Sequence, residues 1–122
     1  MPDVVPFRVL VTGSRSHSDK DLVYKYLDKA LDSKTHVVIV QGDCPTGADY
    51  YAREYASERG LSVEHWPADW SQGRAAGPKR NQDMVNTSPD LVLGFPEGES
   101  RGTRGTIRMA FAAGLTVEVH EI

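Results

Sequence analysis

The sequence predicts an α/β fold, a three-layer Rossmann-like arrangement in which helices cover both faces of a five-stranded, mainly parallel sheet. Short apolar runs rich in β-branched residues alternate along the chain with segments whose apolar residues recur at helical spacing. The strand-like runs are continuously apolar rather than alternating, which is typical of parallel strands buried on both faces. Because crossovers between parallel strands are right-handed, few topologies remain for such a chain.

Five strands and four helices are expected in strict alternation. The strands are expected at residues 7–12, 36–41, 61–65, 90–95 and 115–119, and the helices at about 19–31, 48–59, 78–85 and 103–113. Asp19 or Ser18 can cap the first helix, Gly60 stands where a helix-ending glycine belongs, and Pro78 suits a first helical turn. Residues 1–122 are expected to form one domain.

The composition limits the classes of function. A net charge of −3 gives no electrostatic reason to expect a nucleic acid as the partner. The single cysteine, Cys44, has no partner for an internal disulfide and no His or Cys neighbour at metal spacing, so no metal is expected. The sequence has no apolar run of membrane-spanning length and no recognisable signal peptide, so we expect a cytoplasmic protein without membrane contact.

Three polar turns that contain glycine mark one edge of the predicted sheet. They lie at residues 13–16, 42–47 and 96–103, each directly after a predicted strand, whereas the connections at the opposite edge look like simple helix ends. In open parallel sheets, ligands bind at the carboxyl ends of the strands, near the point where the strand order reverses. This asymmetry predicts a ligand site at the edge that carries the three turns.

The first turn offers Gly13, Ser14 and Arg15 to a ligand. A glycine directly after a strand allows close approach of the backbone, while the hydroxyl and the guanidinium are donors. An ordinary turn explains the same residues. The turn matches neither the Gly-x-Gly-x-x-Gly fingerprint nor the Gly-x-x-x-x-Gly-Lys-Ser/Thr phosphate loop, and no cofactor is expected.

The second turn contains Gly42 and Gly47, which permit a tight exit from the strand, and Thr46, which can cap the following helix. Asp49 falls in the first turn of that helix. A carboxylate there is favoured by the helix dipole whatever the ligand, so helix stabilisation and a functional role both remain open for Asp49.

A third candidate segment, residues 66–81, ends in Lys79, Arg80 and Asn81 at a predicted helix start. The helix dipole disfavours cations at this end, so two positive charges indicate that an anion occupies the spot, although a solvated basic loop is the alternative. Asn81 can recognise amide or hydroxyl groups. Trp66 and Trp70 can stack on a flat base or pack in the protein.

Residues 95–103 are expected to form the main anion seat. Gly98 and Gly102 leave backbone N–H groups open, and Ser100 and Thr103 supply hydroxyls at the start of the last helix. Arg101 and Arg104 bracket the Gly102–Thr103 pair. Two basic helix starts at the same sheet edge would form a single pocket.

These residues together resemble a known group. The motifs are Val11-Thr-Gly-Ser-Arg15, Gly42-x4-Gly-Ala-Asp49, Pro67-Ala-Asp-Trp70, Ala76-Gly-Pro-x-Arg-Asn81 with Met84, and Phe95-Pro-x-Gly-x-Ser-x-Gly-Thr103. They resemble the YspA-type branch of the SLOG superfamily, which is related to the Lonely Guy phosphoribohydrolases and to the Smf/DprA family. The resemblance spans nearly the whole chain and implies a nucleotide or nucleotide-derived ligand, with its phosphate on the Gly102–Thr103 turn and Arg80 nearby. Many members of the wider superfamily are dimers, so a homodimer is left open.

The chain departs from the phosphoribohydrolases at one position. Those enzymes carry an acidic residue just after the Gly-Thr pair, where this sequence has Arg104, Gly105 and Thr106. Cleavage of an N-glycosidic bond needs a group that stabilises an oxocarbenium ion or activates water. Among the nearby carboxylates, Asp49 and Asp69 are the candidates for a general base, while Glu97 and Glu99 are expected to face solvent or to pair with Arg101 or Arg104.

Three alternatives for the function follow. The first is a binding protein that captures a nucleotide as sensor, carrier or sink. The second is an enzyme, a phosphoribohydrolase or related nucleotide hydrolase. The third is a structural or partner-binding domain that retains only the vestige of a pocket.

Overall fold

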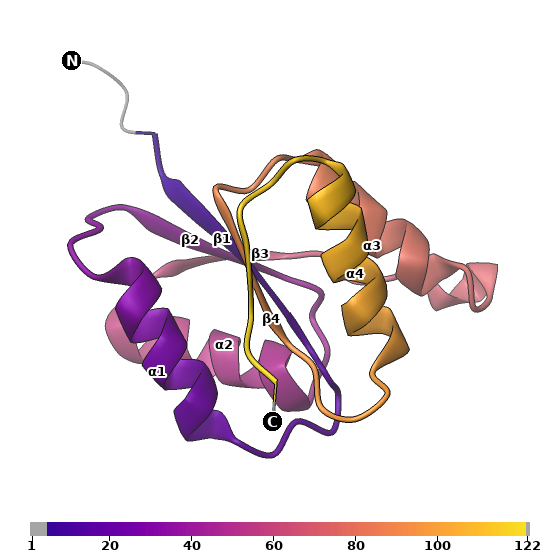
Figure 1. Ribbon diagram of the computed structural model, residues 1–122, viewed down its shortest axis with the longest axis horizontal. Coiled ribbons are helices and arrows are strands. Elements are labelled where there is room, and N and C mark those ends of the chain that lie inside the picture. Colours follow the sequence, from indigo (N-terminus) through magenta and orange to yellow (C-terminus); the bar gives the residue numbers. More distant parts are fainter. Residues whose placement is uncertain (1–4, 122) are drawn as a thin grey trace.

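The computed structural model describes residues 5–121, in which strands and helices alternate along the chain (Figure 1). The strands are β1 (Phe7–Gly13), β2 (Val37–Gln41), β3 (Ser62–His65), β4 (Leu91–Phe95) and β5 (Val117–Val119). The α-helices are α1 (Lys20–Leu31), α2 (Gly47–Arg59), α3 (Ala76–Asn86) and α4 (Arg101–Ala112), and a short 3-10 helix, η1 (Trp70–Gln72), precedes α3.

All five strands are parallel, in the order β3-β2-β1-β4-β5. Helices α1 and α2 cover one face of the sheet, and α3 and α4 lie together on the other (Figure 1). This is the arrangement that right-handed crossovers dictate, because the chain moves first to one side of β1 and then to the other. The predicted three-layer Rossmann-like fold is confirmed.

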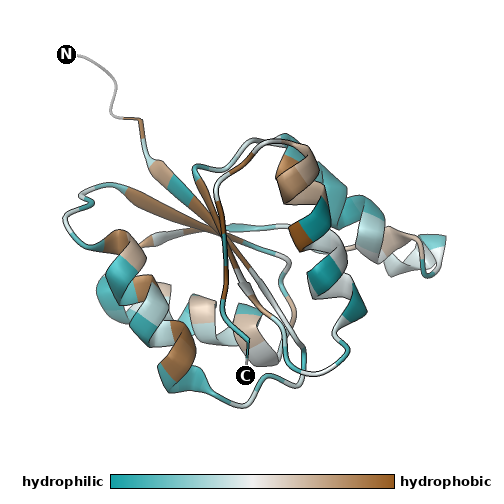
Figure 2. Ribbon diagram, viewed as in Figure 1, coloured by the Kyte–Doolittle hydropathy of each residue, from teal (hydrophilic) through white to brown (hydrophobic). Residues whose placement is uncertain are grey.

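The core consists of two apolar layers that share the central strands. Val9 and Val11 of β1 pack under α1 and α2, while Leu10 between them packs under α3 and α4. Successive side chains of a strand point to opposite faces, so a strand covered on both faces must be apolar at every position. Figure 2 shows mostly hydrophobic colour along the middle of the central strands, with hydrophilic residues on the outer faces of the helices.

Most of the expected helix ends are confirmed. Asp19 caps α1 by accepting a hydrogen bond from the Leu22 N–H at 3.0 Å, and Gly60 ends α2 with a φ of 67°. The expected cap by Thr46 is wrong. Thr46 stands at the N-cap of α2, but its hydroxyl donates to the Arg15 carbonyl at 2.8 Å instead of accepting from the helix.

Two helices begin two residues earlier than expected, at Ala76 and at Arg101. The start of α4 is set by Ser100, which has a left-handed φ of 41° and so separates the loop from the helix. Proline lacks an N–H but fits the first turn of α3, where that N–H has no intrahelical acceptor. Within residues 5–121, no helix has both the length and the apolar character needed to cross a membrane.

Candidate functional site

The strand order reverses between β1 and β4, and a cavity of about 570 Å³ opens where these two strands end. Both strands stop at the same level, since Gly13 is in register with Phe95. Such a switch point is where the loops on the two sides of a parallel sheet diverge and leave space for a ligand. Ten of the residues expected at the site line this cavity, namely Gly13, Ser14, Arg15, Gly42, Asp49, Arg80, Asn81, Ser100, Gly102 and Thr103.

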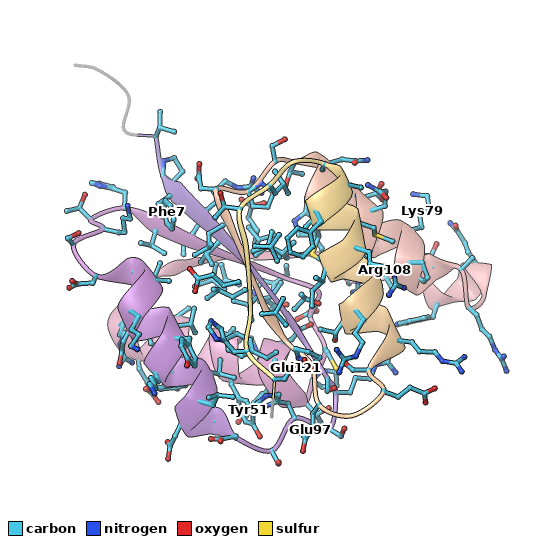
Figure 3. The ribbon with its side chains drawn as sticks, viewed as in Figure 1. Phe7, Tyr51, Lys79, Glu97, Arg108 and Glu121 are labelled. Atoms are coloured by element: carbon cyan, nitrogen blue, oxygen red, sulfur yellow. The ribbon has the colours of Figure 1, made fainter. Side chains whose placement is uncertain are left out.

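Four expected site residues, Gly47, Gly98, Lys79 and Asp69, are not among the residues that line the cavity. Lys79 is exposed on α3, projects to the outside of the molecule and pairs with Asp83 at 3.2 Å (Figure 3). The basic pair predicted at this helix start is therefore divided, because neighbouring residues on a helix point about 100° apart. Only Arg80 faces the cavity.

Gly47 has a structural part at the edge of the site. Its φ is 70°, and a Cβ atom there would lie 2.1 Å from the Ser14 carbonyl oxygen. The absence of a side chain lets α2 start directly against the loop after β1. Gly13 allows the same closeness, since a Cβ on it would lie 2.3 Å from the Ala48 Cβ.

Asp69 is exposed and serves the turn that contains η1. Its carboxylate accepts hydrogen bonds from the N–H and the hydroxyl of Ser71 and from the Gln72 amide. The Ser71 hydrogen bonds lower the pKa of Asp69. A general base for a ligand in the cavity needs to be within reach of it, so the geometry gives Asp69 a capping role instead of the catalytic role considered from the sequence.

Ser14 joins the loop after β1 to the loop after β4. Its Oγ lies 2.7 Å from the Ser100 Oγ and accepts a hydrogen bond from the Glu97 N–H at 3.1 Å. Its backbone N–H donates to the Phe95 carbonyl at 3.2 Å, and its carbonyl accepts from Ala48. Because these contacts span both sides of the switch point, Ser14 holds the two loops in fixed relation.

The N-terminus of α4 opens directly into the cavity, which Arg101, Gly102 and Thr103 line together with Ser100. The first N–H groups of a helix have no acceptor within the helix, and Ser100 at the N-cap makes no side-chain capping bond. Space around Gly102 is open, with no atom within 4 Å of the place where a Cβ would stand. Free N–H groups and the positive end of the helix dipole are the elements of an anion seat.

The charged side chains of the loop before α4 have partners within the protein, and two of them, Glu97 and Glu99, line the cavity. Glu99 pairs with Arg101 at 3.2 Å, as expected, while Glu97 accepts from the Ser18 N–H and hydroxyl at 3.1 and 3.2 Å. Arg104 donates to the Gly98 and Glu99 carbonyls and pairs with Glu121. Arg104 therefore stabilises the loop through its carbonyl groups and does not line the cavity.

Arg80 is half-buried and lines the cavity. One terminal nitrogen, Nη1, donates to the Gly42 carbonyl and to the Trp66 carbonyl, the latter at 2.9 Å, and Nε donates to Asn81 Oδ1 at 2.7 Å. Burial lowers the pKa of its guanidinium, and nearby Asp49 opposes that effect. No acceptor for Nη2 is found within residues 5–121, so two of the five guanidinium N–H groups remain for a ligand.

Asp49 is the buried carboxyl group of the site. It stands in the first turn of α2, where it accepts a hydrogen bond from the Cys44 N–H at 3.2 Å. Removal from water raises its pKa to about 6, against the opposing effects of the Cys44 hydrogen bond and the Arg80 charge. A carboxyl group that titrates near neutral pH can act as a general acid or base.

The sequence reasoning missed several residues that line the cavity, among them Thr12, Ser16, Gly77, Pro78 and Met84. Two signals could have found some of them. Thr12 and Ser16 are the chain neighbours of the candidates Gly13, Ser14 and Arg15, and Met84 stands one helical turn after Arg80, on the same face of α3. Within residues 5–121, no group of three His, Cys, Asp or Glu side chains is arranged to hold a metal ion.

Comparison with known proteins gives two matches. A model of the YspA, cpYpsA-related SLOG family matches residues 7–73, which include β1, β2, β3 and the first two turns of the site. The Gene 61 protein of Mycobacterium phage D29 is 38% identical over 116 residues, which cover 90% of this chain and 93% of that protein.

Proposed function

The chain belongs to the YspA, cpYpsA-related SLOG family, and on that basis we propose that it binds a nucleotide or nucleotide-derived phosphorylated ligand in the cavity between β1 and β4. The single observation that carries the proposal is the uncapped N-terminus of α4, which opens into this cavity at Ser100–Thr103. A phosphate satisfies the free N–H groups there and interacts favourably with the helix dipole.

Two cationic side chains at the cavity are available to an anionic ligand, and the carboxyl groups of Asp49, Glu97 and Glu99 also line the cavity. Arg15 and the free side of Arg80 line it, and no ion pair of Arg15 is found within residues 5–121. The two acidic side chains of the loop before α4 are held by partners in the protein, as described above. In this proposal the chain acts as a sensor, carrier or sink for its ligand. The cavity volume lies within the usual range for small-ligand sites.

A charge placed in the first turn of α4 tests the anion seat. Gly102→Asp is expected to fold, because space around Gly102 is open and the helix dipole favours a carboxylate at this end. The same carboxylate repels a phosphate, so calorimetric titration with AMP and with inorganic phosphate should show at least a tenfold loss of affinity for both.

Gly105→Asp is the matched control. It adds the same charge to the same helix, but Gly105 lines a different surface hollow and not the cavity. Its affinity for AMP should stay within about twofold of wild type. Equal losses in the two variants would contradict an anion seat at the start of α4. Absence of any stabilisation of the wild-type protein by a panel of nucleotides or by phosphate would leave only a structural or partner-binding role.

Asp49 favours a second candidate function, a nucleotide hydrolase of the N-glycosidase type. A carboxyl group with a pKa of about 6 in the wall of the cavity is suited to activate water near neutral pH. Release of free base from nucleoside monophosphates, followed by chromatography, tests this function. An enzyme should lose base release in Asp49→Asn while it still binds the nucleotide, and binding without base release in the wild type would reject it.

A further inference from the structure

One aromatic side chain of the site is largely exposed. Trp70 is 53% exposed and lines both the main cavity and a neighbouring hollow of about 410 Å³. Arg15, Gly42, Cys44 and Arg80 also line both spaces. Trp66, the other tryptophan considered from the sequence, packs instead against the core under α3 and α4 and donates to Glu64 at 3.4 Å.

The structure around Trp70 holds its ring in place. Asp69 caps the η1 turn that carries it, through the hydrogen bonds from Ser71 and Gln72. The ring edge lies against Gly77, where a Cβ atom would be 3.1 Å from the Trp70 Cη2. Glycine is unfavourable within a helix, so its presence in the first turn of α3 suits the close approach of the indole.

One face of the indole is covered by the guanidinium group of Arg15. The Arg15 Cζ lies 5.4 Å from the ring centroid, which is a cation–π contact, and Arg15 is itself exposed on the loop after β1. An exposed guanidinium without an ion pair among the described residues can exchange this contact for a phosphate oxygen. The indole face would then be open to another flat group.

We propose that Trp70 is the stacking platform for the base of the ligand, and that Asp69 positions it. This inference rests on the proposed function, because it places the base of the same phosphorylated ligand. Stacking on a π-face tolerates every base. The proposal therefore covers nucleotides of any base, recognised by ring and phosphate together. Sugar phosphates that lack a base form only the phosphate half of these contacts.

The two tryptophans allow a direct test by fluorescence. In Trp66→Phe, Trp70 is the only indole, and titration with AMP should quench its emission. Ribose 5-phosphate should bind by calorimetry with little quenching. Quenching by AMP should disappear in Trp70→Leu, which is expected to fold because the side chain is exposed.

Affinity measurements distinguish the contribution of the base to binding from that of the phosphate. Trp70→Leu should lower the affinity for AMP on the order of tenfold or more, the effect expected from loss of base stacking, and leave that for ribose 5-phosphate within about twofold. Trp70→Phe should restore part of the loss, and Asp69→Ala should show a smaller loss confined to AMP. If AMP binds Trp70→Leu as tightly as wild type, the stacking platform is refuted while the proposed function stands. If neither the panel of nucleotides, AMP included, nor ribose 5-phosphate binds the wild type, both proposals fail.

Discussion

Replacement of the buried Asp49 by asparagine is expected to change how stability depends on pH. Burial raises the pKa of Asp49 from 3.8 to about 6, so the folded protein holds a proton that the unfolded chain has already lost between these pH values. Stability of the wild type therefore falls as the pH rises through this window, since the unfolded state binds fewer protons than the folded state. Asparagine does not titrate and removes this dependence.

The size of the effect follows from the two pKa values. Their difference of about 2 pH units corresponds to about 3 kcal/mol, at about 1.36 kcal/mol per unit. The free energy of unfolding of the wild type, relative to that of Asp49→Asn, should thus be greatest below pH 4 and lower by about this amount at pH 7. Urea titrations of both proteins at pH 4, 5, 6, 7 and 8 measure the difference.

Asp69 provides the contrast. Hydrogen bonds from Ser71 lower its pKa, so its contribution to stability is present above the ordinary pKa of an aspartate and is lost as the pH falls. The free energy of unfolding of the wild type, relative to that of Asp69→Asn, should therefore rise with pH instead of falling. If the difference between wild type and Asp49→Asn is flat, or rises with pH between 4 and 7, Asp49 ionises without a penalty and the argument from burial is wrong.

Three further substitutions and one control substitution test the framework of the site by urea unfolding. Gly47→Ala should lower the free energy of unfolding by more than about 3 kcal/mol, because its Cβ would meet the Ser14 carbonyl. Gly60→Ala, with a similar positive φ and no atom within 4 Å, should cost only about 1–2 kcal/mol, and similar losses would refute the steric argument. Ser14→Ala should cost about 1–2 kcal/mol, through loss of its hydroxyl hydrogen bonds, and weaken phosphate binding. Arg80→Lys should cost about 2 kcal/mol, since lysine lacks the planar fork that bonds two carbonyls and Asn81, whereas a purely electrostatic role would leave stability unchanged.

The periodicity of the sequence was sufficient for the architecture. Continuous apolar runs in alternation with helical patterns specify strands buried on both faces, and right-handed crossovers then determine the layers. The same reasoning predicted the edge of the site, because the carboxyl ends of parallel strands lie together in any such sheet. The helix ends at Asp19 and Gly60 were predictable as well, since capping depends on local backbone geometry.

The identity of the cavity-lining side chains was decided by tertiary structure. Lys79 and Arg80 are adjacent in the sequence and chemically alike, yet only Arg80 lines the cavity, because the docking of α3 on the sheet selects one direction around the helix. Asp49 and Asp69 looked equivalent as general bases until burial of one and exposure of the other separated them. Burial depends on packing between distant segments, and no local pattern contains that information.

The sequence by itself therefore determined the fold and predicted the edge of the sheet at which the cavity lies. Only the tertiary structure decided that α4 begins at Arg101, so that its free N–H groups open into the cavity, and that Trp70 rather than Trp66 borders it. The physical reason is that these properties depend on interactions over different separations along the chain. Backbone and apolar patterns act within one element, whereas side-chain direction and burial arise when elements far apart in the chain pack together.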